Sequence, residues 1–161
     1  MARVPPFEIP RGEIRDELDR LRHPFRVAID RAKNPFNIGS IIRTAHSFLV
    51  KEIILIGTEP WYERAAMGMQ RYENIGELPS EEEFLRRVAS EGWPLVAFEK
   101  DHAEKGLWEA ELPEDSVVVL GNEDDGCSRG ILVAADQVLA IPMFGIYHSY
   151  PISVEAGIAM A

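Results

Sequence analysis

Residues 25–57, FRVAIDRAKNPFNIGSIIRTAHSFLVKEIILIG, contain the pattern that decides the fold. Two short apolar stretches, FRVAID and EIILIG, flank a segment whose apolar residues recur at three- and four-residue spacing, as in a helix with one buried face. Those residues are Ile38, Ile41, Ile42, Ala45, Phe48 and Leu49. Apolar strands without polar alternation are typical of parallel sheets covered on both faces. The stretch therefore predicts a strand, a helix and a second, parallel strand.

Arg43 lies on the opposite face of this expected helix. At about 100° per residue, it is placed roughly 140° from Ile38, with Gly39 and Ser47 beside it. The helical pattern by itself indicates an ordinary solvated arginine.

The rest of the sequence continues the alternation of strands and helices. Further strands are expected at 94–99, 116–122 and 137–143. Helices are expected at 12–22, 81–91, 129–135 and from about Ser153, the second of them opened by a capping box of Ser80 and Glu83 and closed by Gly92. Residues 59–79 predict only a short helix near 63–67 and then irregular structure. This order predicts an α/β layer sandwich with a mostly parallel sheet between helices.

The composition indicates one globular domain. A chain of 161 residues with 46% hydrophobic and 27% charged residues can bury one core. No apolar run approaches the eighteen or so residues of a membrane span, and the N-terminus lacks the apolar core of a signal peptide. Cys127 is the single cysteine, so no intrachain disulfide can form. A cytoplasmic location is the expectation.

The charge is unevenly distributed. The net charge of −10 opposes binding to a polyanion, because nucleic-acid affinity depends largely on Lys and Arg. Residues 1–51, however, hold ten Lys and Arg against six Asp and Glu, whereas residues 52–161 hold seven against twenty-one. The asymmetry is a weak pointer to a basic binding face, and an incidental distribution is favoured unless another feature supports such a face.

Three loops that follow strands deserve attention, because open parallel sheets bind ligands at the carboxyl ends of their strands. They are NPFNIG, GNEDDGCSRG and MFGIYHSYPISVEAG. None contains a dinucleotide-binding or P-loop glycine motif. Glu123, Asp124 and Asp125 predict a tight acidic turn with Gly126 rather than a metal site, and the four histidines lack the spacing of zinc ligands. Cys127 is predicted to be a buried structural thiol rather than a nucleophile.

Taken together, the three loops resemble the successive signatures of the SpoU (TrmH-like) branch of the SPOUT RNA methyltransferases. The matching stretches are NxGxxxR at 37–43, LGNEDDG at 120–126 with AIPMFG at 140–145, and SYPISVEAG at 149–157. The resemblance covers about residues 25–161 and leaves 1–24 as a basic helical extension. It implies a SPOUT fold with a C-terminal deep trefoil knot, S-adenosylmethionine as cofactor, a homodimer, and methyl transfer to a ribose 2′-hydroxyl of tRNA or rRNA.

The resemblance also implies roles for individual residues. The implied catalytic residues are Arg43, Asn37, Glu123 and Ser149, and the implied cofactor contacts are Phe98, Gly121, Asn122, Ile141, Met143 and Tyr150. Each has a purely structural alternative: core packing for the apolar residues, a turn acid for Glu123, and a helix N-cap for Asn37. A guanidinium remains protonated at pH 7, so Arg43 is expected to stabilise negative charge on the acceptor oxygen or to contact a phosphate.

Pro151 departs from the family pattern, which has Ser-Leu-Asn where this sequence has Ser149-Tyr150-Pro151. A side-chain amide is thereby replaced by a ring without a hydrogen-bond donor. Two alternatives follow. The enzyme could methylate a base or a non-RNA molecule, or the protein could be a catalytically silent RNA-binding protein of the same fold.

Overall fold

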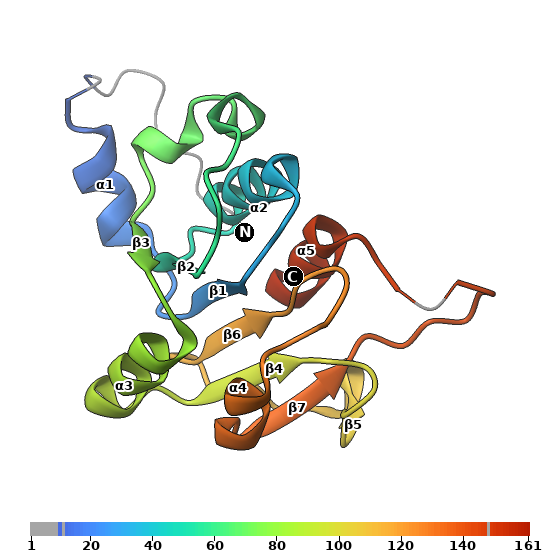
Figure 1. Cartoon of the computed structure of the whole chain (residues 1–161). Helices are drawn as coiled ribbons and strands as arrows, with labels where there is room; N and C mark the ends of the chain where they lie inside the picture. The colour runs from blue at the N-terminus through green and yellow to red at the C-terminus, as the bar shows by residue number, and fades with distance from the viewer. Residues whose placement is uncertain (1–9, 11, 148) are drawn as a thin grey trace.

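The computed structural model describes residues 10, 12–147 and 149–161. In these residues seven strands form one sheet in the order β3-β2-β1-β6-β4-β7-β5, and every neighbouring pair is parallel (Figure 1). The strands are β1 (Arg26–Asp30), β2 (Glu52–Ile56), β3 (Ile75–Leu78), β4 (Leu95–Phe98), β5 (Lys105–Gly106), β6 (Val117–Leu120) and β7 (Gln137–Ala140). The predicted parallel α/β sheet is confirmed.

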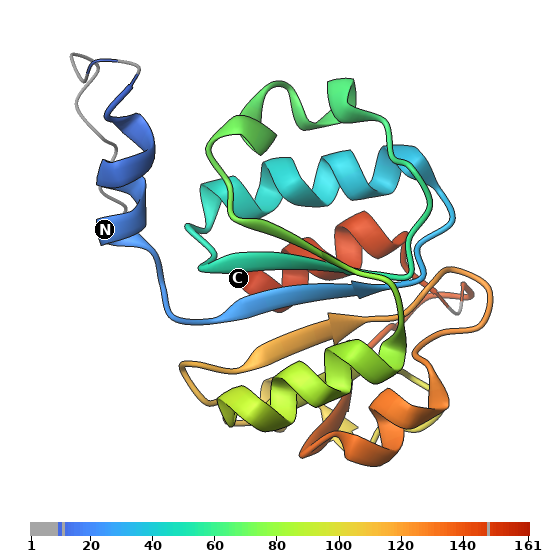
Figure 2. The same cartoon turned by 60° about the vertical axis from the view of Figure 1, so that its left-hand side comes forward.

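Helices cover both faces of the sheet (Figure 2). The α-helices are α1 (Ile14–Leu21), α2 (Pro35–Ser47), α3 (Glu81–Glu91), α4 (Arg129–Ala134) and α5 (Ile152–Met160), and the 3₁₀ helices are η1 (Glu63–Ala66), η2 (Met69–Arg71) and η3 (Leu107–Glu109). The core has two parts: α2 and α5 pack on one face, while α3 and α4 pack on the other. No helix in this part of the chain has the length and apolar character needed to cross a membrane.

The central strand β1 shows why the strands are apolar throughout. Val27 and Ile29 point into the core beneath α2 and α5, and Ala28 points into the core beneath α3 and α4. Because both faces are covered, water-facing positions are absent from this strand and the period-two alternation disappears. β1 pairs in parallel with β2, so the predicted strand-helix-strand unit is confirmed.

Helix α2 is slightly shorter than its apolar pattern predicts. Ile38, Ile41, Ile42 and Ala45 are fully buried, but the helix ends at Ser47 and Leu49 has a left-handed backbone with φ of 49°. The spacing of apolar residues indicates which side of a segment is buried. It can extend beyond the end of a helix when the next residues also pack on the core.

Two edge strands were not predicted. The short helix η1 lies where one was expected, but β3 follows it and pairs with β2, and the two-residue β5 pairs with β7. Both strands lie at the edges of the sheet, where a strand needs few buried residues. The sequence of β3, IGEL, has too few apolar residues for periodicity to detect.

The helix caps show which asparagine begins α2, Asn34 or Asn37. Ser80 accepts a hydrogen bond from the backbone N–H of Glu83 at 3.3 Å, and Gly92 closes α3 with φ of +67°. In α2, Asn34 is the N-cap and accepts from the N–H of Phe36 at 3.0 Å. The alternative that Asn37 is the N-cap is therefore wrong. Its side chain is available for another contact.

Candidate active site

Four loops meet at the carboxyl ends of β1, β6, β4 and β7. These strands are neighbours in the sheet and run in the same direction, so the segments that follow them lie at one edge. A cavity of about 290 Å³ lies among the loops after β4, β6 and β7. All six predicted cofactor contacts line it: Phe98, Gly121, Asn122, Ile141, Met143 and Tyr150. Residues separated by more than fifty positions thus come together around one cavity.

The cavity has an apolar side. Phe98 at the end of β4 and Ile141 after β7 are buried, and Met143 is half-buried beside them. These side chains offer a surface on which the flat apolar face of a ligand can pack. Gly121 allows a close approach, because a Cβ at this position would overlap the backbone of Gly126.

The loop after β6 is a tight turn closed by its own hydrogen bonds. Oδ1 of Asn122 accepts from the backbone N–H groups of Asp124 at 2.9 Å and Asp125 at 2.7 Å, and Asn122 and Gly126 exchange backbone hydrogen bonds of 3.1 Å. Gly126 has φ of +68°, in the region that favours glycine. The predicted acidic turn is confirmed. Nδ2 of Asn122 is buried and has no partner among the described residues.

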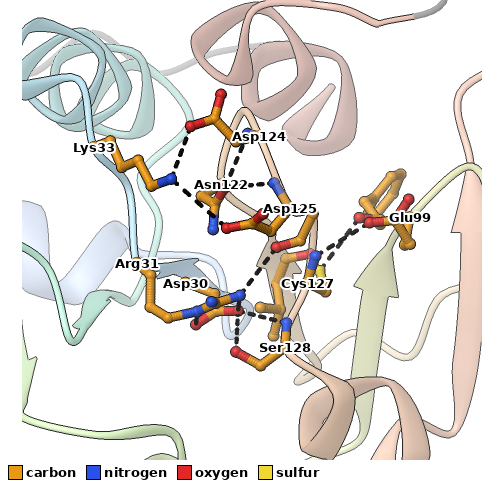
Figure 3. A network of polar contacts seen from close by, with 12 residues as sticks. Asp30, Arg31, Lys33, Glu99, Asn122, Asp124, Asp125, Cys127 and Ser128 are labelled. Atoms are coloured by element: carbon orange, nitrogen blue, oxygen red, sulfur yellow. Dashed lines mark hydrogen bonds and ion pairs between the residues drawn. The ribbon is translucent and has the colours of Figure 1, made fainter.

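The segment after β1 anchors this turn from one side (Figure 3). The fully buried carboxylate of Asp30 accepts from both the backbone N–H and the hydroxyl of Ser128, at 2.7 and 2.5 Å. Nζ of Lys33 lies 2.7 Å from a carboxylate oxygen of Asp124. Since Lys33 and Asp124 are both exposed, most of the anchoring energy comes from Asp30.

Glu99 anchors the turn from the other side (Figure 3). Its Oε2 accepts the backbone N–H of Cys127 at 3.1 Å, and its Oε1 accepts that of Asp101 at 3.3 Å. The Cys127 thiol is buried and donates to the carbonyl of Phe98 at 3.4 Å. Burial raises the pKa of this thiol above its ordinary value, with a further contribution from nearby carboxylates such as that of Asp30. Cys127 is a buried thiol, as predicted, and is unsuited to act as a nucleophile.

Of the four predicted catalytic residues, three lie together and one lies apart. Nδ2 of Asn37 donates to Oε1 of Glu123 at 2.7 Å, and Glu123 and Ser149 both line the cavity. Ser153, on α5, reaches Oδ1 of Asn37 at 3.4 Å. Arg43 is exposed on α2 and does not line the cavity, and its guanidinium makes no hydrogen bond or ion pair with another described residue.

Two acidic residues of the cavity were missed in the sequence. Glu99 and Glu155 both line it, and Glu155 is half-buried. Burial raises the pKa of Glu155 to about 7, and the negative charge of Glu99 adds to the effect. Signals for both were present: Glu155 is the one charged residue of the apolar helix ISVEAGIAM, and Glu99 directly follows a strand.

Pro151 forms the N-cap position of α5 with φ of −54°. This φ suits the start of a helix, and the ring has no N–H that would need a partner. The loop before it exposes Phe144, Ile146 and Tyr147 almost completely. The proline is thus compatible with the local backbone. The amide that the family pattern places here has no counterpart at this position.

Groups of acidic or histidine side chains do not form a metal site in the part of the chain that the structure describes. Asp124 and Asp125 instead face Lys33, at 2.7 and 3.6 Å.

These features define an α/β protein with a ligand cavity at the carboxyl ends of parallel strands, closed by a glycine-containing turn and by the segment that leads into the last helix. The sequence profile of the SpoU rRNA Methylase family matches residues 24–161, nearly the whole chain. The chain belongs to this family.

Individual relatives agree with the family assignment. The chain is 27% identical over 154 residues to the 23S rRNA (guanosine-2′-O-)-methyltransferase of Neisseria meningitidis, covering 92% of this chain and 61% of that protein. It is 26% identical over 151 residues to the tRNA (guanosine(18)-2′-O)-methyltransferase of Aquifex aeolicus, covering 91% of this chain and 72% of that protein. The chain thus spans less than two thirds of the first of these relatives.

A solved structure shares the fold. The SpoU methyltransferase AviRb from Streptomyces viridochromogenes, crystallised in complex with AdoMet, superposes with a TM-score of 0.79 at 26% identity. The match covers 90% of this chain and 62% of that one.

Proposed function

We propose that the protein is an S-adenosylmethionine-dependent methyltransferase that modifies a ribose 2′-hydroxyl of structured RNA, either tRNA or rRNA. The observation that carries the proposal is the cavity in which all six predicted cofactor contacts meet. The named activities of the relatives and the cofactor of the AviRb crystal support it.

The cavity fits this cofactor in three respects. Phe98, Ile141 and Met143 offer an apolar surface for the adenine ring. The unpaired Nδ2 of Asn122 is a buried donor that a ligand acceptor would satisfy, since buried polar groups are rarely left without partners. The carboxylate of Glu155 suits a cationic ligand. Bound S-adenosylmethionine would supply a methyl group already activated by its sulfonium.

The chain's own residues then have to position the acceptor and stabilise charge. In the proposal, Arg43 contacts the 2′-oxygen or the neighbouring phosphate, where its permanent charge stabilises developing negative charge. Asn37 and Glu123 hold the loop after β6 against the start of α2, and Ser149 borders the cavity. Positioning of the hydroxyl in line with the methyl supplies much of the rate enhancement in such a site.

A homodimer belongs to the same proposal. Arg43 is exposed and does not line the cavity of its own chain, so in the proposal it acts on the cavity of a partner subunit. Exposed apolar side chains are available for the contact, among them Val154 on α5, which is 46% exposed. The proposal also includes a trefoil knot in the C-terminal segment. Residues 25–161 form the catalytic domain, which a basic extension precedes. The proposed location is the cytoplasm, where tRNA and rRNA are found.

The experiment is methyl transfer from labelled S-adenosylmethionine to total tRNA and to rRNA, followed by digestion to nucleosides. Label in 2′-O-methylated nucleosides supports the proposal. Label in a methylated base would show that the acceptor is a base and not a ribose hydroxyl. Pro151 would then be the first residue to examine. Saturable cofactor binding without transfer to any RNA would contradict the enzymatic assignment in favour of a silent RNA-binding protein.

A further inference from the structure

Glu155 is the most unusual side chain of the cavity. It lies one turn into α5, a helix whose other residues are apolar or small and which packs on α2. Burying a carboxylate is costly unless a partner compensates the charge. The side-chain carboxylate of Glu155 forms no hydrogen bond or ion pair with another described residue, yet Glu155 lines the cavity. The missing partner is therefore expected to be the ligand.

The charged groups around Glu155 do not compensate it. Glu99 faces it from the end of β4 and raises its pKa further. Glu99 is itself held in place by the N–H groups of Cys127 and Asp101, so it cannot turn away without losing both bonds. The remaining charged or titratable side chains of the cavity are Lys100, Asp101, His102, Glu123, Asp124, Asp125, Cys127 and Tyr150. The acidic residues outnumber the basic ones, which favours a cationic ligand.

A second observation points to a ligand at the same place. Asn122 also lines the cavity, is 5% exposed, and has an Nδ2 without a partner among the described residues. An unpaired amide donor and an uncompensated carboxylate would together suit a ligand with both an acceptor and a positive charge. S-adenosylmethionine has both features. Its sulfonium is the part that changes during the reaction.

We propose that Glu155, supported by Glu99, is a specificity-determining residue that distinguishes the sulfonium of S-adenosylmethionine from the neutral thioether of S-adenosylhomocysteine. The inference rests on the proposed function. In methyl transfer the C–S bond breaks, its electron pair stays on the sulfur, which becomes a neutral thioether, the new C–O bond forms, and the hydroxyl proton passes to solvent. The carboxylate then faces a neutral sulfur, so the product is held less tightly than the substrate and leaves more readily.

Calorimetric titration of the full chain with each compound tests the proposal. Both compounds carry the same amino-acid ammonium and carboxylate, so the ratio of their affinities isolates the change at sulfur. At pH 8 the Glu155→Gln variant, which keeps the side-chain shape, is expected to bind S-adenosylmethionine about tenfold more weakly and S-adenosylhomocysteine less than about threefold more weakly. Glu91→Gln, an exposed residue at the end of α3, is the charge-matched control and should leave both affinities unchanged.

The pH dependence provides a second readout that a purely structural role would not produce. Between pH 5.5 and 8.5 the preference of the wild type for the sulfonium compound should rise through about pH 7, where Glu155 ionises. In Glu155→Gln this rise should be absent. A Glu155→Gln variant that binds both compounds with the wild-type ratio would overturn the inference and leave the proposed function standing. A folded wild-type protein that binds neither compound would overturn both.

Discussion

The side-chain amide of Asn37, on α2, lies 2.7 Å from a carboxylate oxygen of Glu123, in the loop after β6. The two residues are separated by 86 positions in the chain. Their contact joins the first family signature to the second and fixes the start of α2 against one wall of the cavity. Because the bond is exposed to solvent, it contributes little to stability and is better placed to position groups around the acceptor.

Removal of this bond should affect turnover more than stability. Asn37→Ala and Glu123→Ala are each expected to slow single-turnover methyl transfer by about 10- to 100-fold, because the acceptor is held less well, and to lower the free energy of unfolding by less than about 1 kcal/mol. The double variant should be no slower than the slower single variant. Asn74→Ala, which removes another exposed amide–carboxylate contact at 3.2 Å to Asp19, is the control and should leave transfer unchanged. Fully additive losses would contradict a joint role.

Arg43 should act in the partner subunit's site. Arg43→Ala is expected to reduce methyl transfer by at least about 100-fold while changing cofactor affinity less than about threefold, because the side chain lies away from its own cavity. The exposed Arg86 on α3, across the sheet, provides the matched Arg86→Ala control.

A mixing experiment separates action within a subunit from action between subunits. Met143→Trp is designed to fill the cavity and should be inactive by itself. In a heterodimer with an Arg43→Ala subunit, one site would combine an intact cavity with an intact partner arginine and recover activity. Two inactive variants that stay inactive after verified heterodimer formation would refute action between subunits.

Gly126 should be intolerant of a side chain for a reason that Gly92 does not share. The two glycines have nearly the same φ, +68° and +67°. A Cβ at Gly126 would overlap the carboxylate of Glu99, whereas a Cβ at Gly92 would have no atom within 4 Å among the described residues. Gly92→Ala should cost about 1 kcal/mol of backbone strain. Gly126→Ala should cost about 2–3 kcal/mol, since Glu99 must give up its bonds as well, and should weaken cofactor binding at least tenfold. Urea unfolding and calorimetry measure both effects; equal costs at the two positions would be inconsistent with the overlap.

Glu155 should make stability depend on pH. Burial raises its pKa from an ordinary value of 4.5 to about 7, so between these values the native state holds a proton that the unfolded chain has released. The free energy of unfolding therefore falls as pH rises through this interval, by on the order of 3 kcal/mol at most. Glu155→Gln removes this loss, so it should be more stable than the wild type at pH 8 and similar to it near pH 4.5. Urea unfolding at both pH values measures the difference. A wild-type-like decline in the variant would show that another group titrates.

The central strands of the sheet and several residues that line the cavity could be predicted from the sequence. The apolar stretches of β1, β2, β4, β6 and β7 were visible because both of their faces are buried, and the three loop signatures named six residues that line one cavity. The edge strands β3 and β5 were missed because an edge strand needs little burial and leaves little periodicity. Asn37 was ambiguous until the structure showed Asn34 as the N-cap.

By itself, the sequence determined the central strands, the helices that cover them and the loops that follow those strands, because these depend on local spacing of apolar residues and on caps. Only the tertiary structure decided that β1, β6, β4 and β7 are neighbours, that Glu99 and Glu155 line one cavity, and that Arg43 does not line it. The physical reason is that these relationships depend on strand pairing and helix packing between distant parts of the chain. Local periodicity records that a residue is buried, but it does not record what the residue is buried against.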